Sequence, residues 1–443
     1  MSLPGRKSLV PVTLVVALLV VGCGGTGPTV PTGVSVNGLV VDVDGQPLSD
    51  WLVYIAGRPT EVSGEDGSFT FEEVTTPYDL TVANVTDEFS HTFLGLTTTS
   101  PTIVPLAMQL AAAAGTFSAD IAGDLVNATY TPLPANHRAR VCAEGVGRVV
   151  LGCTTVVGGA AFTVFARWTG NSSASVRLRA FIYETDANGL ATNIVASGTT
   201  TTFALSDGDG VMGENVTLVD DTAQDSVSVT VALPTGFSLL SSELIATYSD
   251  FASISPGSGP GPSATETLIA PQHPGAAHTV LVQAMNDDVV AGNSTVAWSA
   301  GVDLADPVAL ELPVPPTLVT PVEAASGVDI DTDFTVTNPE GGVLTFVFQP
   351  VFPQEGPTYA VSTVETTTKI PNLSTLGIPL PASADYGWVL LATPDSSTTD
   401  EAVGSGGLLD QFVQAALISD GGAPAPDTSG RISTSPSRTF TTD

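Results

Sequence analysis

Glycine and proline recur along the whole sequence and leave little room for long helices. The 443 residues include 44 glycines and 33 prolines, so the segments between these residues are short. Many of those segments carry Val-x-Thr and Thr-x-Thr patterns, whose β-branched residues favour strands. The sequence therefore predicts an all-β protein. Because a β-sandwich module takes about 100 residues, the length indicates tandem β-sandwich domains, about four in number.

The N-terminal leader has the layout of an export signal. Arg6 and Lys7 supply a positive start, residues 9–21 are largely apolar, and a glycine precedes Cys23. The apolar run is shorter than the about 20 residues that a membrane-spanning helix needs, so we expect a cleaved leader. The segment resembles the processing site of bacterial lipoproteins. That resemblance implies a signal peptide over residues 1–22 and lipidation of Cys23, and the alternative is an ordinary secretory leader with an incidental cysteine.

The lipoprotein resemblance also implies a location. Cys23 would carry several acyl chains, and each buried CH₂ group contributes about 0.8 kcal/mol to anchoring. Gly24 stands where an aspartate is linked to inner-membrane retention in enteric bacteria. We therefore expect an outer-membrane, lipid-anchored protein that faces the periplasm or the cell surface. Residues 23–33 are rich in Gly, Thr and Pro without apolar periodicity, which predicts a flexible tether.

Residues 34–110 alternate short apolar strands with Gly/Asp turns. The pairs that begin at Asp44 and Asp66 are Asp-Gly hairpin signals, and Phe69 and Phe71 give one buried strand face. This pattern resembles the carboxypeptidase regulatory-like domain, a small prealbumin-like sandwich. The resemblance implies an accessory rather than a catalytic domain. The zinc carboxypeptidases that such domains accompany need a His-x-x-Glu pair, and none of the 4 histidines is followed by Glu at that spacing.

The rest of the chain carries further groups of strand candidates. They predict β-sandwiches over residues 111–213 and 214–313, although one larger sandwich over both stays open because no clean linker separates them. The Pro/Gly-rich residues 256–262 predict a long loop.

Residues 314–443 form the last predicted unit. It opens with a Val-Pro-Pro sequence, and we predict Trp388 as a core aromatic residue and residues 437–441 as the final strand. Together these features resemble a bacterial immunoglobulin-like or fibronectin-type-III-like domain. Between residues 408 and 417, apolar side chains recur at helical spacing, which predicts a short amphipathic helix.

Two cysteines remain once Cys23 is lipidated. Cys142 and Cys153 are flanked by strand-like sequence, so we expect a hairpin disulfide in an exported chain. Closing a loop of this length would contribute on the order of 3 kcal/mol. The alternative is a pair of buried free thiols.

Arginine is concentrated in one part of the chain. Six of the 12 basic residues lie between Arg138 and Arg179, and Arg177 and Arg179 alternate on one predicted strand. Alternate residues share a strand face, and two guanidinium groups there would suit an acidic glycan or another carboxylate ligand. The competing interpretation is that this face only balances nearby Asp and Glu side chains.

The charge balance and the missing motifs exclude several function classes. Without Arg6 and Lys7, ten of the 12 basic residues remain against 45 acidic ones, so we expect no nucleic-acid partner. The Gly-x-Ser-x-Gly, Gly-x-x-x-x-Gly-Lys and His-Glu-x-x-His motifs do not occur in the sequence. Acidic residues gather at 207–214, where the spacing is not that of an EF-hand loop, and at 329–333, where solvation at the start of a strand explains them. Calcium binding at either place is the open alternative. We therefore predict no catalytic residues, no metal site and no cofactor.

These observations predict a non-catalytic, membrane-anchored lipoprotein that serves as a structural or adhesion-type β-sandwich array at the cell envelope. Its expected partners are the membrane, through the lipid anchor, and an envelope or cell-surface protein or glycan. The alternative is a glycan-binding or substrate-binding accessory protein that works with a separate envelope hydrolase. A hydrolase in its own right is the third hypothesis, because triad residues meet only in the fold.

Overall fold

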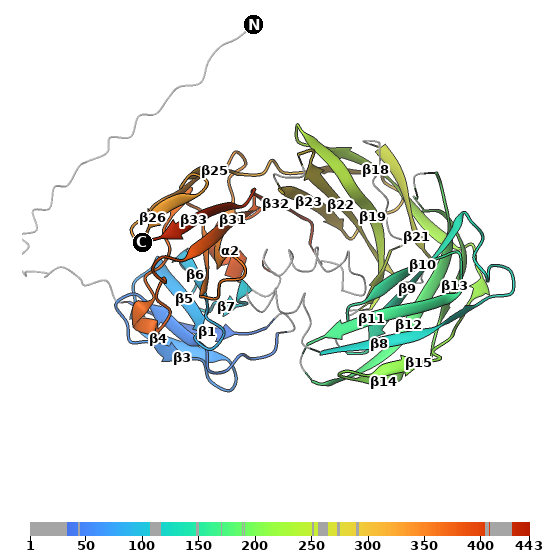
Figure 1. Cartoon of the computed structure of the whole chain (residues 1–443), viewed down its shortest axis with the longest axis horizontal. Helices are drawn as coiled ribbons and strands as arrows, with labels where there is room; N and C mark the ends of the chain where they lie inside the picture. The colour runs from blue at the N-terminus through green and yellow to red at the C-terminus, as the bar shows by residue number, and fades with distance from the viewer. Residues whose placement is uncertain are drawn as a thin grey trace, which may run out of the picture.

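The computed structural model describes residues 33–42, 45–106, 117–147, 150–169, 171–187, 189, 191–249, 252–255, 265–272, 275–288, 292–403, 407 and 428–443. These residues form strands almost throughout, interrupted by the short helices η1 (Ser374–Leu376) and α2 (Thr399–Val403). The all-β prediction with tandem sandwiches is confirmed. The strands group into four modules arranged around an arc (Figure 1).

The first module packs a three-stranded sheet, β4-β1-β7, over the strands β3-β2-β5-β6 of a larger sheet. Phe69 and Phe71 of β4 are both buried in its core, as their spacing predicts. The predicted turn at Asp66 also forms, because the Asp66 carboxylate accepts a hydrogen bond from the Ser68 amide. The strands are β1 (Val34–Val40), β2 (Leu52–Ile55), β3 (Glu61–Val62), β4 (Ser68–Val74), β5 (Tyr78–Asn84), β6 (Phe89–Leu96) and β7 (Thr102–Ile103).

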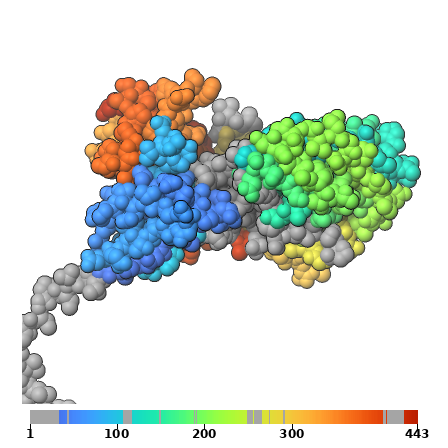
Figure 2. All heavy atoms as spheres, turned by 90° about the horizontal axis from the view of Figure 1, so that it is seen from below, coloured from blue at the N-terminus to red at the C-terminus, as the bar shows by residue number. Residues whose placement is uncertain are grey.

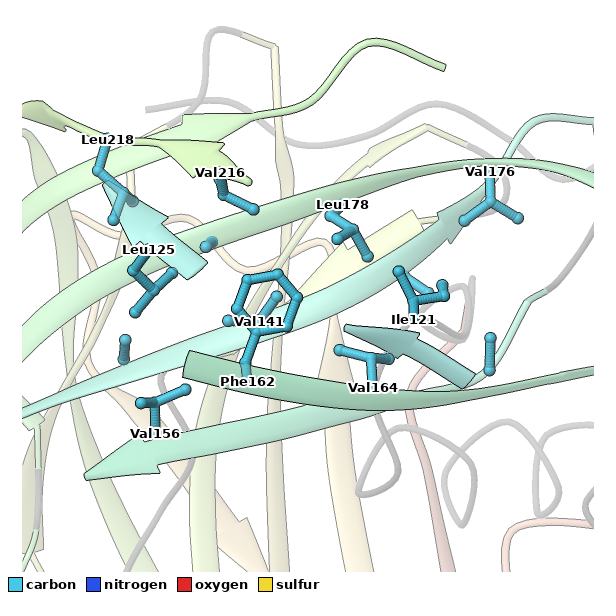
Figure 3. Packing of buried hydrophobic residues seen from close by; sticks show 14 of the residues in the cluster. Ile121, Leu125, Val141, Val156, Phe162, Val164, Val176, Leu178, Val216 and Leu218 are labelled. Atoms are coloured by element: carbon cyan, nitrogen blue, oxygen red, sulfur yellow. The ribbon is translucent and has the colours of Figure 1, made fainter. Parts of the chain in front are cut away.

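The second module is a sandwich of its own, and none of its described strands belongs to the large sheet. Side chains of β9 and β12, including Val141 and Leu178, meet those of β8 and β11, including Ile121 and Phe162 (Figure 3). The strands are β8 (Phe117–Val126), β9 (His137–Gly145), β10 (Cys153–Val157), β11 (Ala161–Trp168), β12 (Ser173–Thr185), β13 (Ala191–Thr199), β14 (Phe203–Ser206), β15 (Gly210–Met212), β16 (Val216–Thr217) and β17 (Val219–Asp220). The last two pair with β8 and β13, so the pairing of this module runs beyond residue 213.

The third module packs the sheet β21-β18-β24 over the strands β20-β19-β22-β23. Its core also receives side chains from the second module, among them Phe181 and Tyr183 of β12. One face of the second module's sheet is therefore buried against the third module. The strands are β18 (Gln224–Ala232), β19 (Phe237–Ser249), β20 (Ala252–Ile254), β21 (Thr265–Pro271), β22 (Ala277–Asn286), β23 (Ser294–Ala300) and β24 (Val308–Glu311).

The fourth module is built around an aromatic core. Trp388 of β31 is fully buried, as predicted, and its ring centroid lies 5.1 Å from that of Phe334 in an edge-to-face contact. Such contacts add about 0.5–1.5 kcal/mol beyond the buried area. The strands are β25 (Thr317–Thr320), β26 (Ala325–Val328), β27 (Phe334–Thr337), β28 (Val343–Pro350), β29 (Thr358–Thr363), β30 (Thr367–Thr368), β31 (Asp385–Thr393), β32 (Gly430–Thr434) and β33 (Arg438–Thr442).

One sheet of 14 strands runs through the first, third and fourth modules. Strand β6 of the first module pairs in parallel with β29 of the fourth, and β32 pairs with both β23 and β31. Strand β28 is buried on both faces, because Val347 faces the first module's core while Phe346 and Phe348 face the fourth module's core. The modules follow one another in sequence, but the fourth returns in space to the first.

Several predicted features lie outside the described residues. These are the leader, Cys23, most of the tether, the loop at residues 256–262 and the amphipathic helix at residues 408–417. In the described part of the chain, no helix is both long and apolar enough to cross a membrane.

Candidate functional site

The sheet face of the second module that is turned away from its core carries the predicted site residues. On β9, residues Arg138, Arg140, Cys142 and Glu144 alternate with core residues, so they share this face. The register places Arg179 of β12 beside Cys142 and Arg177 beside Glu144. The third module covers part of the same face, because Cys142 and Phe181, the β12 partner of Arg140, belong to the third module's core.

Cys142 and Cys153 form a disulfide in the structure. They lie directly opposite each other on β9 and β10, with their Cα atoms 4.1 Å apart. Cys142 is buried against the third module and Cys153 packs beside it. The bond therefore fastens an outer strand at the place where the two modules meet.

Arg177 and Arg179 converge on one buried carboxylate. The Nε atom of each donates to a different oxygen of Glu144, whose side chain is only 1% exposed, whereas 37% of Arg177 and 18% of Arg179 remain exposed. Burial of a carboxylate is costly unless it is paired and hydrogen-bonded, and the two guanidinium groups meet that need. This geometry agrees with local charge balance, the competing interpretation of the pair.

The aromatic residues near the arginines in sequence do not form a binding platform beside them. Trp168 is buried in the second module's core, where its indole nitrogen donates to the Asn171 carbonyl oxygen. Tyr183 is 3% exposed, and burial raises its pKa while the nearby positive charges of Arg140 and Arg138 lower it. The hydroxyl of Tyr183 is therefore uncharged at neutral pH and hydrogen-bonds to Thr155, while its side chain packs in the core of the third module.

Arg138 and Arg140 lie on the same face and are two arginines that the sequence pattern did not single out as a pair. Arg138 is exposed, and Arg140 is half-buried with its Nη1 atom 3.2 Å from the Thr155 hydroxyl oxygen. Their alternation on β9 was readable from the sequence. The sequence does not show the strand register. That register lets Glu144 pair with Arg177 and Arg179 and not with Arg138 or Arg140.

The three histidines that the structure describes are each held by one or two polar neighbours. His91 is fully buried, with its Nε2 atom 2.9 Å from the Ser362 hydroxyl oxygen and its Nδ1 atom accepting a hydrogen bond from the Leu106 amide. His278 lies 3.0 Å from Asp225 and His137 lies 3.7 Å from Glu184. Within the residues that the structure describes, no histidine contacts both a serine hydroxyl and a carboxylate.

The carboxylates of the acidic loops accept hydrogen bonds from backbone amides, within their own turns and, for Asp207, from strand β8. Asp207 accepts a hydrogen bond from the Ser118 amide, and Asp209 accepts one from the Ser206 amide. Asp329 accepts bonds from the Asp331 amide and the Thr332 hydroxyl, and these bonds lower its pKa. Across the described ranges, no group of three or more His, Cys, Asp or Glu side chains is arranged to hold a metal ion.

A small pocket lies where the third and fourth modules meet. It has a volume of about 270 Å³, and its walls include Phe237, Asn293 and four prolines, Pro234, Pro315, Pro316 and Pro436. The Asn293 side-chain oxygen is buried without a hydrogen-bond partner. Its lining contains no charged side chain, so the pocket offers shape and apolar contact rather than acid–base chemistry.

Comparison with known proteins adds little to this geometry. No protein-family model matches the chain. No curated protein matches its sequence. The carboxypeptidase regulatory-like and immunoglobulin-like resemblances therefore stay predictions.

Solved structures give partial likenesses at low sequence identity. The fimbrial anchor protein Mfa2 from Porphyromonas gingivalis is 10% identical over 39% of this chain and 79% of its own, with a TM-score of 0.17. The Bacillus anthracis TIE protein is 6% identical over 63% of this chain and 50% of its own, with a TM-score of 0.18. BcpA, the major pilin subunit of Bacillus cereus, is 6% identical over 63% and 99%, with a TM-score of 0.13. At these scores the likenesses carry no argument about function.

Proposed function

We propose that the chain is a non-catalytic envelope lipoprotein that is anchored through Cys23. In this proposal the modules form a compact arc, with the first module at one end and the second module, which binds the partner, at the other. The single observation that carries this proposal is the 14-stranded sheet, which ties the first, third and fourth modules together. The second module contributes no strand to that sheet and lies at the other end of the molecule from the first (Figures 1 and 2).

The position of Cys23 in the sequence determines which end of the arc would lie at the membrane. Cys23 lies ten residues before Gly33, where the described chain enters the first module. Ten residues of flexible chain span roughly 16–19 Å on average, so the first module would stay near the bilayer. The second module would then be held away from the lipid by the rest of the arc.

A binding role is favoured over catalysis by what the described residues offer. The buried histidine that contacts a serine is sealed in the sheet that joins the first and fourth modules, out of reach of a substrate. The exposed Arg138 and the partly exposed Arg177 lie on the second module instead. The accessory role beside a separate hydrolase stays the alternative, and it differs only in the identity of the partner.

Fractionation tests the anchor. The full chain should appear in the outer-membrane fraction, and a Cys23→Ala variant should move to the soluble fraction. Protease treatment of intact cells should then cut the second module if it faces outward, and only after permeabilisation if it faces the periplasm. A Cys23→Ala variant that stays in the membrane fraction would contradict the proposal.

Small-angle X-ray scattering of detergent-solubilised protein tests the arc. A compact chain of this length has a radius of gyration of about 22 Å, and the arc should lie closer to that value than to the roughly doubled value of an extended series. A scattering curve that fits four modules in a straight line would contradict the compact arc.

A further inference from the structure

The second module differs from the others in charge. Residues 117–218 hold six arginines against eight acidic residues, whereas residues 219–313 hold no lysine or arginine and 11 acidic residues. Residues 33–106 likewise hold one arginine against 11 acidic residues. A polyanion that approaches this protein is therefore repelled by most of its surface, and the second module is the place where that repulsion is weakest.

Among the described arginines on the outer face of β9 and β12, Arg138 and Arg140 are not bound to Glu144. Arg177 and Arg179 are occupied by Glu144. In the described ranges, Arg138 forms no hydrogen bond or ion pair, and Arg140 bonds only the neutral Thr155 hydroxyl. The two side chains leave the same face of β9 about 7 Å apart, because alternate strand residues have that spacing.

The surroundings of the pair define the ligand further. Val157 of β10 lies opposite Arg138 and is 63% exposed, which gives the pair an apolar flank. Glu243 of β19 raises the pKa of Tyr183 by its negative charge, while Arg138 and Arg140 lower it, so the third module brings a negative charge close to the pair. Tyr183 itself is buried, so no aromatic ring is offered here for stacking nucleic-acid bases.

We infer that Arg138 and Arg140 bind the carboxylates of an acidic polysaccharide. Planar guanidinium groups match carboxylates in two-point hydrogen bonds. Successive carboxylates of a linear polyanion can meet both arginines at once, because the two side chains lie about 7 Å apart along β9. This inference deepens the proposed function, because it rests on the second module being the exposed end and names its partner.

The test uses the full chain in detergent and polygalacturonate as the probe, with neutral dextran and a single-stranded oligonucleotide beside it. An Arg138→Gln/Arg140→Gln variant should raise the Kd for polygalacturonate by about tenfold and flatten its dependence on salt. The matched control is Arg58→Gln/Lys369→Gln, which removes two charges from the first and fourth modules and should change the Kd by less than about twofold.

Several results would overturn the inference. They are equal loss of binding in both variants, equal affinity for dextran or for the oligonucleotide, and no binding to polygalacturonate at low salt. Circular dichroism of both variants confirms that neither has unfolded. The outcome is separate from that for the proposed function, because membrane fractionation of Cys23→Ala reports on the anchor whether or not polygalacturonate binds.

Discussion

Gly430 lies directly against the indole ring of Trp298. The two residues are paired across β32 and β23, and a Cβ atom at position 430 would lie 2.6 Å from Cζ2 of the ring. The ring has no room to move, since Trp298 is 1% exposed and its Nε1 atom donates to the Thr428 carbonyl oxygen. This contact sits on β32, the strand that connects the third module to the fourth.

A methyl group at position 430 should therefore loosen that connection. We expect Gly430→Ala to destabilise the third and fourth modules by about 1–3 kcal/mol, the usual range for overpacking a filled site. Urea unfolding followed by tryptophan fluorescence measures the loss. Gly387→Ala on neighbouring β31 is the matched control, because the nearest atom to its Cβ would be 3.7 Å away. Equal effects of both substitutions would show that the Trp298 contact is not decisive.

The junction of the first and fourth modules should weaken in mild acid. Burial lowers the pKa of His91 from 6.5 to about 3, so the unfolded chain binds a proton that the folded chain refuses. Stability is then complete above the unfolded pKa and falls as the pH drops below it. The loss should be about 2 kcal/mol at pH 5.

Hydrogen exchange of the β6 and β29 amides at pH 8 and pH 5 measures this loss. His91→Gln should remove most of the pH dependence between these values, whereas His137→Gln in the second module should leave it in place. Unchanged pH dependence in His91→Gln would assign the acid sensitivity to carboxylates instead.

Removing Glu144 should cost more than removing one of its arginines. Glu144→Ala leaves two partly exposed guanidinium groups without their carboxylate, and we expect a loss of about 2–3 kcal/mol, reduced by the solvent that still reaches Arg177. Arg177→Gln alone leaves Arg179 in place and should cost less. The double variant Arg177→Gln/Arg179→Gln isolates a buried carboxylate, so its loss should exceed the sum of the single losses in thermal unfolding. Strict additivity would mean that the three groups do not act together.

The Cys142–Cys153 disulfide should support the junction of the second and third modules. A Cys142→Ser/Cys153→Ser variant should lose on the order of 3 kcal/mol. Mass spectrometry of the intact chain before and after reduction detects the bond, and denaturant unfolding with and without reductant measures its effect. The double variant is its own control, because reductant should no longer change its stability. A wild-type chain insensitive to reductant would contradict the prediction.

Local patterns in the sequence predict the strands and the buried faces, and they do so for a physical reason. Phe69 and Phe71 alternate with polar residues, and Trp388 lies in an apolar run. The burial of each residue can therefore be predicted from its neighbours in the sequence. No local sequence pattern indicates which distant strands will pair. His91 and Ser362 are 271 residues apart, and neither segment indicates that it will pair in parallel with the other. The sequence therefore predicts separate modules in series, whereas three of the modules share one sheet.

The candidate site shows the same division. Its residue types were visible, since the arginines between residues 138 and 179 stand out in so acidic a chain. Their roles depend on register, because a shift by one residue would move Glu144 to the opposite face of β9. The pairing that occupies Arg177 and Arg179 and leaves Arg138 exposed is a property of the fold and not of any short segment.

The parallel pairing of β6 with β29 has a consequence for how the protein is made. When the first module emerges during synthesis, the strand that will complete its edge lies more than 260 residues away in the unfinished chain. Until β29 arrives, β6 presents unpaired backbone groups that can template unwanted strand pairing. The first module is therefore completed only after β29 of the fourth module has been made. A chain truncated before β29 would keep an unpaired edge at β6.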